Sequence, residues 1–420
     1  MARKILEICK DILIVLLALA IVVLTLLALP TKTIASTPWL ATVLRPIAPL
    51  FGLSQSELAY SGEAVSGEVH GAAQPIAISV RNDAGRMSAQ YDFAALDTAF
   101  EQFGSTLAQA LDSAQAGSTV SAQAVLSALS GPGVAFCYPE KLPPSAVAAW
   151  LNASAPELPD AQWFILTIEE GSVALYLAGG KAYRCQTSLP AATLESAIAE
   201  CQPDGSFFAF ESAAYDRAAP LSLVSPDAAP LEAVAANPCE ARFVSALASS
   251  LGFNPYGDAK YVDPTGTTSF TETTHALAVT AAGEATLQIL EPLERFQSAA
   301  DSTASRIEAA RGLLSTIAGD ALGDARLYLT AVTEQDGQTV CEFRYFLNGI
   351  PVSAIAPARV TFDGDQITEA QITLRTLQLT AQPAALLPAA QAAAILGSGQ
   401  ALTLCYVEQG EGVLTAAWKG

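Results

Sequence analysis

The chain has 420 residues and a formal net charge of −20, with 41 acidic residues against 21 lysines and arginines. Such an acidic chain is poorly suited to binding DNA or RNA by phosphate neutralisation, so we expect no nucleic-acid partner. The same charge repels anionic lipid headgroups, so the body of the protein is not expected to lie flat on a membrane. The length is sufficient for two or three domains.

The first strongly patterned segment is Ile12 to Leu29, which contains no charged residue and only one polar residue, Thr25. Eighteen helical residues rise about 27 Å, close to the hydrocarbon thickness of a bilayer. We therefore predict one transmembrane helix. Arg3, Lys4 and Lys10 precede it, which predicts a cytoplasmic N-terminus and an extracytoplasmic body in the cell membrane. A cleaved signal peptide is the alternative, but its apolar core is normally shorter and ends in a clearer cleavage site.

The seven cysteines include no C-x-x-C pair, which disfavours metal and thioredoxin-like sites. Several lie in apolar, strand-like runs such as Phe136–Tyr138 and Leu404–Tyr406. This setting predicts buried core cysteines, with one or two disulfides as the alternative. We expect no metal site and no cofactor.

Residues 30–60 are interrupted by prolines and form a predicted juxtamembrane connector, in which Trp39 is placed for the membrane interface. Residues 61–215 predict an α+β domain. Its expected elements are a hairpin turning at Asn82–Gly85, helices at 93–111, 120–129 and 193–201, and strands at 163–168, 173–177 and 182–185. A stretch rich in Pro, Ala, Ser and Asp, 216–235, is the predicted linker.

The C-terminal part contains the clearest fold pattern. Helices are expected at 239–251, 302–317 and 388–396, and strands at 269–270, 276–280, 285–289, 402–407 and 413–418. Three hairpin dipeptides, Asp336–Gly337, Asn348–Gly349 and Asp363–Gly364, separate expected strands at 325–334, 339–347, 351–362 and 366–376. Apolar and polar residues alternate along the second and fourth of these strands, which predicts an antiparallel meander with helix 302–317 available to cover it.

The predicted fold class is therefore α+β, with a single N-terminal transmembrane helix followed by extracytoplasmic domains of antiparallel sheet packed with helices. The predicted segments are a cytoplasmic tail (1–11), the transmembrane helix (12–29), the connector (30–60), a first extracytoplasmic domain (61–215), a linker (216–235) and a C-terminal domain with the meander (236–420).

Short motifs of the C-terminal domain carry a family resemblance. They are Leu251–Pro255 followed by Tyr261 and Gly266–Glu272, the hairpin Phe346–Val352, and Leu387–Ala392 followed by Tyr406 and Ala417–Trp418. In these passages, and in its basic tail, single helix and acidic body, the chain resembles the YycH/YycI regulators of the WalK (YycG) sensor kinase of Gram-positive bacteria. The resemblance is best over 240–420, and the chain departs from the pattern at Thr265, where an Asp is expected before Gly266.

The resemblance implies a regulatory partner role and no catalysis. It implies contact with a sensor histidine kinase, and with a paralogous regulator as a second partner, through the transmembrane helix and the outer domains. Helices in membranes associate through small residues. The candidate partner-binding residues are therefore Ala18, Ala20, Thr25, Ala28 and the interfacial Trp39. An inert anchor is the alternative for this helix.

Catalytic patterns are scarce in the sequence. The two histidines, His70 and His275, are far apart, and no zinc-protease, P-loop or nucleophile-elbow motif is present. His275 lies in a polar, strand-like stretch, so we predict an exposed surface histidine, and we predict no enzyme activity. Two alternatives remain open. One is a structural or peptide-binding cell-envelope protein that recruits extended peptides at a sheet edge. The other is an extracytoplasmic hydrolase, which requires a cleft with convergent polar groups.

Overall fold

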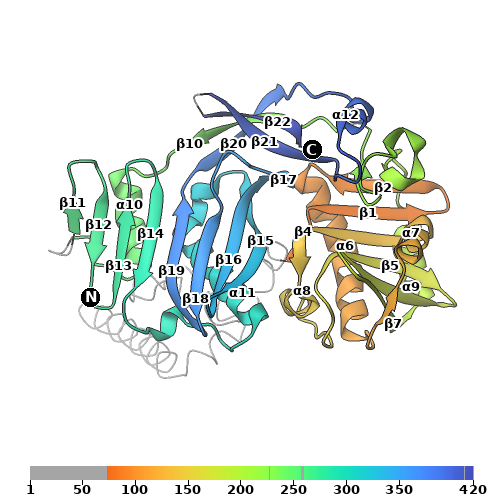
Figure 1. The fold of residues 1–420 in the computed structure, drawn as a ribbon, viewed down its shortest axis with the longest axis horizontal. Helices are drawn as coiled ribbons and strands as arrows, with labels where there is room; N and C mark the ends of the chain where they lie inside the picture. The colour runs from red at the N-terminus through yellow and green to blue at the C-terminus, as the bar shows by residue number, and fades with distance from the viewer. Residues whose placement is uncertain (1–72, 227, 257–259, 411, 420) are drawn as a thin grey trace, which may run out of the picture. The chain divides into compact units, whose positions relative to one another are not determined.

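The computed structural model describes residues 73–226, 228–256, 260–410 and 412–419. The predicted tail, transmembrane helix and connector (1–60) lie outside these residues and stay predictions. Gly67 to Gly420 groups as one compact unit, and its described part is α+β, with antiparallel sheets and seven α-helices (Figure 1). One hydrophobic cluster contains residues of both predicted extracytoplasmic domains, for example Phe136 and Phe343. The boundaries drawn at 61–215 and 236–420 are not tested by this and also stay predictions.

The first sheet has seven strands in the order β2-β1-β4-β5-β6-β7-β3. The strands are β1 (Ala77–Asn82), β2 (Gly85–Gln90), β3 (Ser118–Val120), β4 (Gly133–Leu142), β5 (Ala161–Glu169), β6 (Ser172–Ala178) and β7 (Ala182–Pro190). The predicted hairpin and the three predicted strands are confirmed. The inner strand β4 pairs with both β1 and β5. It was not among the expected elements, although the run Phe136–Tyr138 within it was described as strand-like.

Four helices accompany this sheet: α6 (Phe93–Asp112), α7 (Ala122–Ser130), α8 (Pro144–Trp150) and α9 (Ala191–Ile198). The predicted helix 93–111 is confirmed as α6, because Asp92 caps its first turn and its apolar positions recur every three or four residues and are buried. Phe100 of α6 packs edge-on against Phe136 of β4. The opposite sheet face carries Trp163 and Ile165, which cluster with Leu129 of α7.

The segment after this sheet folds over the α7 face. It contains β8 (Phe207–Phe208), the 3-10 turns η2 (Ala209–Glu211) and η3 (Ala213–Tyr215), and β9 (Leu223–Val224). The Phe208 ring lies 5.5 Å from the Trp163 ring, so this segment is part of the core and not a free connection.

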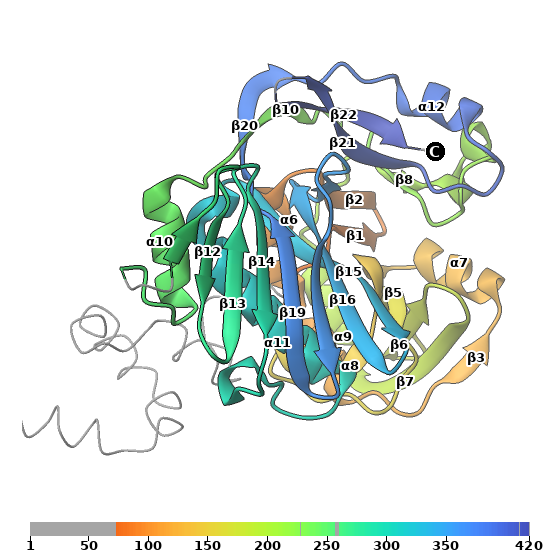
Figure 2. The ribbon, with the colours of Figure 1, turned by 60° about the vertical axis from the view of Figure 1, so that its left-hand side comes forward.

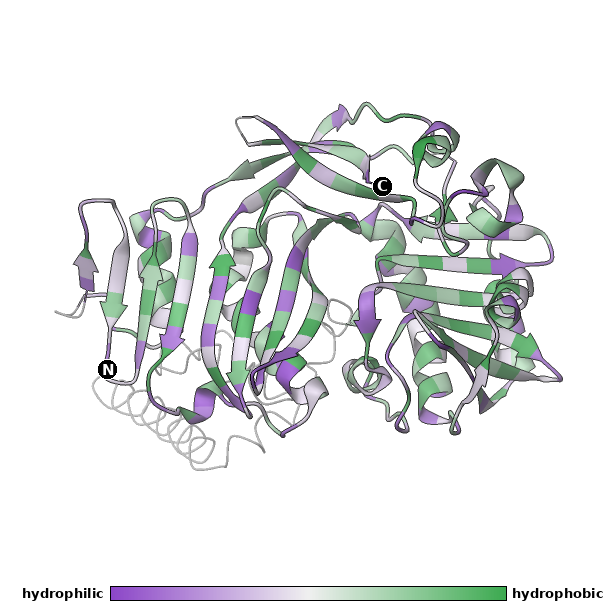
Figure 3. Ribbon diagram, in the orientation of Figure 1, coloured by the Kyte–Doolittle hydropathy of each residue, from purple (hydrophilic) through white to green (hydrophobic). Residues whose placement is uncertain are grey.

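The second sheet has nine strands in the order β11-β12-β13-β14-β19-β18-β16-β15, with β17 paired to β16. The strands are β11 (Lys260–Val262), β12 (Thr268–Thr271), β13 (His275–Val279), β14 (Glu284–Ile289), β15 (Ala325–Gln335), β16 (Gln338–Leu347), β17 (Ile350–Pro351), β18 (Ala358–Asp363) and β19 (Gln366–Thr373). Hydrophilic and hydrophobic residues alternate along the central strands (Figure 3). This period of two separates a buried face from a polar one.

The buried face of the second sheet is covered by helices. They are α10 (Ala241–Ser250) and α11 (Thr303–Ala318), with the 3-10 turns η4 (Glu294–Phe296) and η5 (Gly319–Leu322). Helix α11 packs on β16, β18 and β19, as the sequence predicted for helix 302–317. Ser302 caps its N-terminus and Gly319 ends it with a positive φ of 49°.

The predicted meander is confirmed in its pairing, since β15, β16, β18 and β19 are successive antiparallel neighbours. The expected strand 351–362 is wrong as one element, because it divides into β17 and β18. Pro351 has no N–H to continue a ladder. Beyond it the chain turns away, and the N–H of Ser353 donates to the Tyr406 carbonyl of another sheet at 3.0 Å.

A third sheet joins segments that are distant in the sequence, in the order β20-β10-β22-β21. Its strands are β10 (Leu231–Ala236), β20 (Thr376–Pro383), β21 (Thr403–Gly410) and β22 (Val413–Lys419), and α12 (Ala389–Ile395) lies between β20 and β21 in the chain. Figure 2 shows these four strands as a layer separate from the nine-stranded sheet. The last residues of the predicted linker 216–235 are therefore part of a strand that pairs with β20 and β22.

The six described cysteines are all free thiols, and five of them are buried. Cys137 of β4 and Cys341 of β16 lie in sheet cores, where burial raises the pKa of each thiol, that of Cys341 to about 12. The prediction of core cysteines is confirmed for these residues, and the disulfide alternative is not realised among them.

Candidate interaction surface

The candidate partner-binding residues of the sequence, Ala18, Ala20, Thr25, Ala28 and Trp39, all lie outside the described residues, and their roles stay predictions. Within the described part of the chain, no helix combines the length and apolarity needed to cross a membrane. The same residues contain no group of three or more His, Cys, Asp and Glu side chains arranged to hold a metal ion.

The passage Leu251–Pro255 ends helix α10 in a Schellman motif. Gly252 adopts a positive φ of 85° and donates its N–H to the Ser249 carbonyl at 3.0 Å, while Phe253 donates to the Ala248 carbonyl at 2.9 Å. This turn directs Phe253 inward, where its ring lies 6.0 Å from Phe270 of β12. The motif is therefore a helix stop that also anchors the loop to the sheet.

Beyond this anchor the chain emerges into solvent. The Asn254 side chain accepts the N–H of Tyr256 at 3.1 Å, and the Tyr256 side chain is 92% exposed. After three residues that the structure does not describe, β11 begins at Lys260. Its next two side chains, Tyr261 and Val262, are 63% and 54% exposed.

The turn between β11 and β12 is held by one carboxylate. Asp263 accepts the backbone N–H groups of Thr265 and Thr267, each at 2.9 Å, and the Thr265 hydroxyl at 2.7 Å. These bonds, led by the one from the Thr265 hydroxyl, hold the pKa of Asp263 below its ordinary value. Thr265, which departs from the family pattern, thus supports the turn by donating to Asp263.

Strand β11 is the edge of the nine-stranded sheet, and no strand among the described residues pairs with its outer side. We call Tyr256, Tyr261 and Val262 together the edge patch. They are three of the seven large hydrophobic side chains that are exposed in the described part of the chain. An edge strand presents unpaired N–H and C=O groups, which favour pairing with an extended chain. Tyr261 and Val262 lie on this edge strand and Tyr256 lies in the chain shortly before it, so β11 with these exposed residues is the candidate interaction surface.

His275 begins β13, two strands from the edge strand β11, and is buried at 6% exposure, so the prediction of a surface histidine is wrong. The rings of Phe253 and Phe296 flank it, with centroids 4.2 and 6.0 Å away. Its Nδ1 lies 2.9 Å from the Thr274 hydroxyl, and its Nε2 lies 2.8 Å from the Arg295 guanidinium. Burial, and then the Arg295 charge, hold the pKa of His275 below its ordinary value.

The second family-like passage, Phe346–Val352, contains a type I′ turn that contacts the first sheet and its helix. Asn348 and Gly349 have φ values of 50° and 77°. The Asn348 side chain accepts the N–H of Phe93, the first residue of α6, at 3.2 Å. Gly349 lies against the Ile76 carbonyl, where an added Cβ would approach to 2.8 Å. This motif joins two parts of the fold and presents no reactive group.

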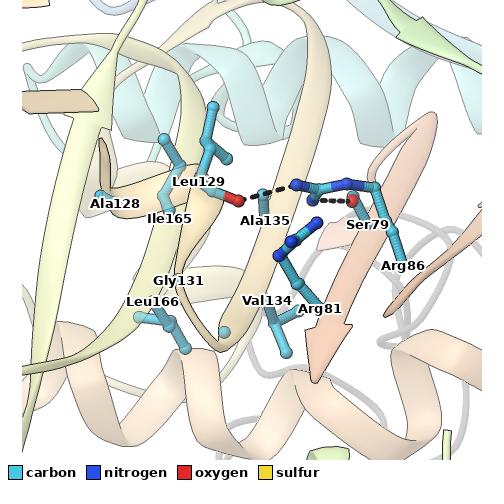
Figure 4. Close-up of a pocket in the computed structure, with 11 residues that line it drawn as sticks. Ser79, Arg81, Arg86, Ala128, Leu129, Gly131, Val134, Ala135, Ile165 and Leu166 are labelled. Atoms are coloured by element: carbon cyan, nitrogen blue, oxygen red, sulfur yellow. Dashed lines mark hydrogen bonds between the residues drawn. The ribbon is translucent and has the colours of Figure 1, made fainter. Parts of the chain in front are cut away.

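The cavity in Figure 4 is also a structural feature. Its volume is about 10 Å³, roughly one water molecule. Arg86 borders it and donates to Ser79 at 2.9 Å and to the Leu129 carbonyl at 2.7 Å. Glu211 is the third partner of Arg86 and forms an ion pair with it at 3.0 Å. Because the polar groups of Arg86 are satisfied within the chain, the cavity offers no evident ligand site.

No protein-family model matches the chain, and no curated protein matches it. Among solved structures, the chain is similar to a crystal structure of YycH from Bacillus subtilis, with a TM-score of 0.50 and 11% identity over 81% of this chain and 92% of that one. A second match, to the β subunit of DNA polymerase III from Thermotoga maritima, has a TM-score of 0.13 and 8% identity over 86% of this chain and 94% of that one, and carries no argument. The chain therefore has a YycH-like fold.

Proposed function

We propose that the chain is a membrane-anchored, extracytoplasmic accessory regulator of a sensor histidine kinase and that it acts by protein–protein contact. The observation that most strongly supports this proposal is the YycH-like fold, which extends over 81% of the chain. The sequence motifs that resemble the YycH/YycI regulators of the WalK kinase support the same role. The kinase, the paralogous regulator and the membrane anchor at 12–29 are parts of this proposal.

The edge patch is the surface that we assign to partner contact. Tyr256 and Tyr261 are exposed aromatic side chains, and aromatic residues are favoured anchors at protein interfaces. The outer edge of β11 supplies main-chain groups that an extended partner segment would satisfy. The transmembrane helix, through Ala18, Ala20 and Thr25, is the second proposed contact.

Site-specific photo-crosslinking tests this assignment in native membranes. A photoreactive amino acid replaces Tyr256 or Tyr261 in the full-length chain, and Ala18, Ala20 or Thr25 in separate chains. The matched control is Ile395 of α12, another large hydrophobic residue, which is 76% exposed and lies outside the edge patch. We expect a sensor kinase to be captured from the test positions and not from Ile395. Capture of no kinase from any test position would refute the proposal.

The alternative of a peptide-binding or structural envelope protein is favoured by one observation, the open edge of β11. Under that function, the same crosslinks at Tyr256 and Tyr261 would capture envelope proteins other than a kinase. The hydrolase alternative has no such support, because His275 is buried between two aromatic rings.

A further inference from the structure

His275 and Arg295 form a contact that depends on the protonation of the histidine. An arginine guanidinium only donates hydrogen bonds, so Nε2 of His275 must accept at the 2.8 Å contact. The proton of the neutral ring is then on Nδ1 and is donated to the Thr274 hydroxyl at 2.9 Å. The observed arrangement is therefore possible only for neutral histidine.

Arg295 also holds the loop that leads to the edge patch. Its guanidinium donates to the Leu251 carbonyl as well as to His275, and it stacks 4.5 Å over the ring of Phe296. The guanidinium occupies the space beside Gly252 that a Cβ would need. One side chain thus links the end of α10, the start of β13 and the turn η4.

The charges around His275 come from two elements. Arg295 in η4 disfavours a protonated ring, and Glu272, before β13, favours it. The Leu251 carbonyl acts on the ring as a hydrogen-bond acceptor that favours protonation, whereas Phe253 and Phe296 are apolar and Thr274 is neutral. Burial and Arg295 outweigh the Leu251 carbonyl and Glu272, so the folded loop resists protonation of His275.

We propose that His275 and Arg295 form an acid-sensitive latch that holds residues 251–256, and with them Tyr256 of the edge patch, in the position that the structure shows. Protonation puts an N–H on Nε2, directly opposite the guanidinium N–H. Two donors and two positive charges then meet at 2.8 Å, so the contact between Arg295 and His275 breaks and the hold of Arg295 on the Leu251 carbonyl weakens. The loop opens locally while the rest of the fold is retained.

The size of the effect follows from proton linkage. In the open loop His275 meets water and takes up a proton near its ordinary pKa of about 6.5, whereas in the closed loop its pKa is lower. The open state binds more protons, so falling pH favours opening. At pH 5.5, about one unit below the ordinary pKa, the opening equilibrium rises by up to roughly tenfold. Above pH 7.5 the latch is closed.

Hydrogen exchange of the full-length chain in detergent tests the latch. The Gly252 and Phe253 amides are donors of the Schellman bonds and report opening directly. After correction for intrinsic exchange, we expect their protection to fall by up to about tenfold between pH 7.5 and 5.5, with no change in α6. In His275→Gln the side-chain oxygen accepts from Arg295 at any pH, so protection there should not depend on pH. An equal fall in His275→Gln would overturn the proposal.

A second measurement tests the latch without the His275→Gln chain, should that variant fail to fold. The chain has two histidines, so a His70→Gln chain leaves His275 as the single histidine to be titrated by NMR. We expect a pKa below about 6.5. A value at or above this would overturn the latch.

Control of partner contact by this latch rests on the proposed function, and the two can be tested separately. Kinase capture from Tyr256 at pH 7.5 tests the function, and failure there leaves the exchange result standing. If capture succeeds at pH 7.5, we expect it to fall at pH 5.5 in the natural chain and not in His275→Gln. Equal capture at both pH values would refute regulation by the latch.

Discussion

Replacing Glu211 by Ala removes the carboxylate that binds the buried Arg86. Glu211 accepts two hydrogen bonds from Arg86, at 3.0 and 3.2 Å, and one from Arg81 at 3.3 Å. It also accepts the N–H of Phe208 at 2.7 Å, which holds the segment from 207 to 224 on the first sheet. Burial lowers the pKa of Arg86, and the hydrogen bonds and charge of Glu211 oppose that shift. Without Glu211 a buried positive charge has no counter-ion.

The expected loss of stability can be worked from these contacts. Removing one partner of a buried ion pair costs about 3–5 kcal/mol. The Arg86 side chain is 2% exposed and the Glu211 side chain 18%, so water screens the pair in part and the lower end, about 3 kcal/mol, applies. With an unfolding entropy of about 2.1 cal/mol/K per residue over roughly 350 residues, this lowers Tm by about 4 °C.

Thermal unfolding of the full-length chain measures this loss. It can be followed by tryptophan fluorescence, to which Trp163 contributes from a ring 5.5 Å from Phe208. The matched control is Glu342→Ala, which breaks a single ion pair of 2.8 Å with Arg359, whose side chain is 55% exposed. That change should cost less than about 1 kcal/mol. If Glu211→Ala and Glu342→Ala melted within about 1 °C of each other, the argument from the buried guanidinium would be refuted.

Three further changes test other parts of the fold. Gly252→Ala places a Cβ at a φ of 85° against Arg295 and should destabilise by about 1–2 kcal/mol in thermal unfolding, whereas Gly171→Ala, with a φ of 81° and open space, should cost less. Asn348→Ala loses the bond to the Phe93 N–H and strains the turn, for about 2 kcal/mol, and Asn348→Gly should recover part of this in the same assay. Among the described cysteines, half-buried Cys239 should react first with iodoacetamide, read by peptide mass spectrometry, and equally fast labelling of Cys341 would contradict the buried core.

The second sheet was the most predictable part of the fold because its turns carry local information. Asp336–Gly337 and Asn348–Gly349 have positive φ at both positions, as a type I′ turn requires. At the third turn only Gly364 has a positive φ, with a value of 61°, so Asp363 was assigned the wrong backbone conformation. The alternation predicted for the strand after this turn is confirmed, since Ala370 and Ile372 are buried.

Among the strands that the sequence analysis did not predict, β4 and β20 were missed for different physical reasons. The run Val134–Tyr138 in β4 is buried throughout, because the strand lies in the middle of its sheet and is covered on both faces. A continuous apolar run without alternation does not distinguish a strand from a buried helix. Strand β20 follows β19 after two residues and leaves for another sheet. Its pairing with β10 brings together residues about 140 positions apart, and no local pattern encodes that.

The roles of His275 and Arg295 could not be predicted from the sequence for a similar reason. The neighbours of His275 in sequence are polar, which suggested a surface position. Its burial comes from Phe253 and Phe296, each about twenty positions away. No sequence pattern marks Arg295 as a functional residue. The exposed position of Tyr256 was weakly indicated by the sequence, because Tyr256 follows Pro255 directly after a helix stop, where loops leave the core.

The passages that resemble the regulator family act first on the fold. Leu251–Pro255 ends α10 and fixes Phe253 in the core, and Asn348–Gly349 joins the β16 hairpin to the start of α6. Turn motifs of this kind explain a shared fold and do not by themselves mark a partner surface. That surface should lie where side chains contribute little to folding, as at Tyr256 and Tyr261. Substitutions in the motifs should therefore lower Tm before they alter partner capture, and Tyr256→Ser or Tyr261→Ser should reduce capture at unchanged Tm. If substitutions in the motifs reduced capture at unchanged Tm, and Tyr256→Ser and Tyr261→Ser did not, the partner surface would lie elsewhere.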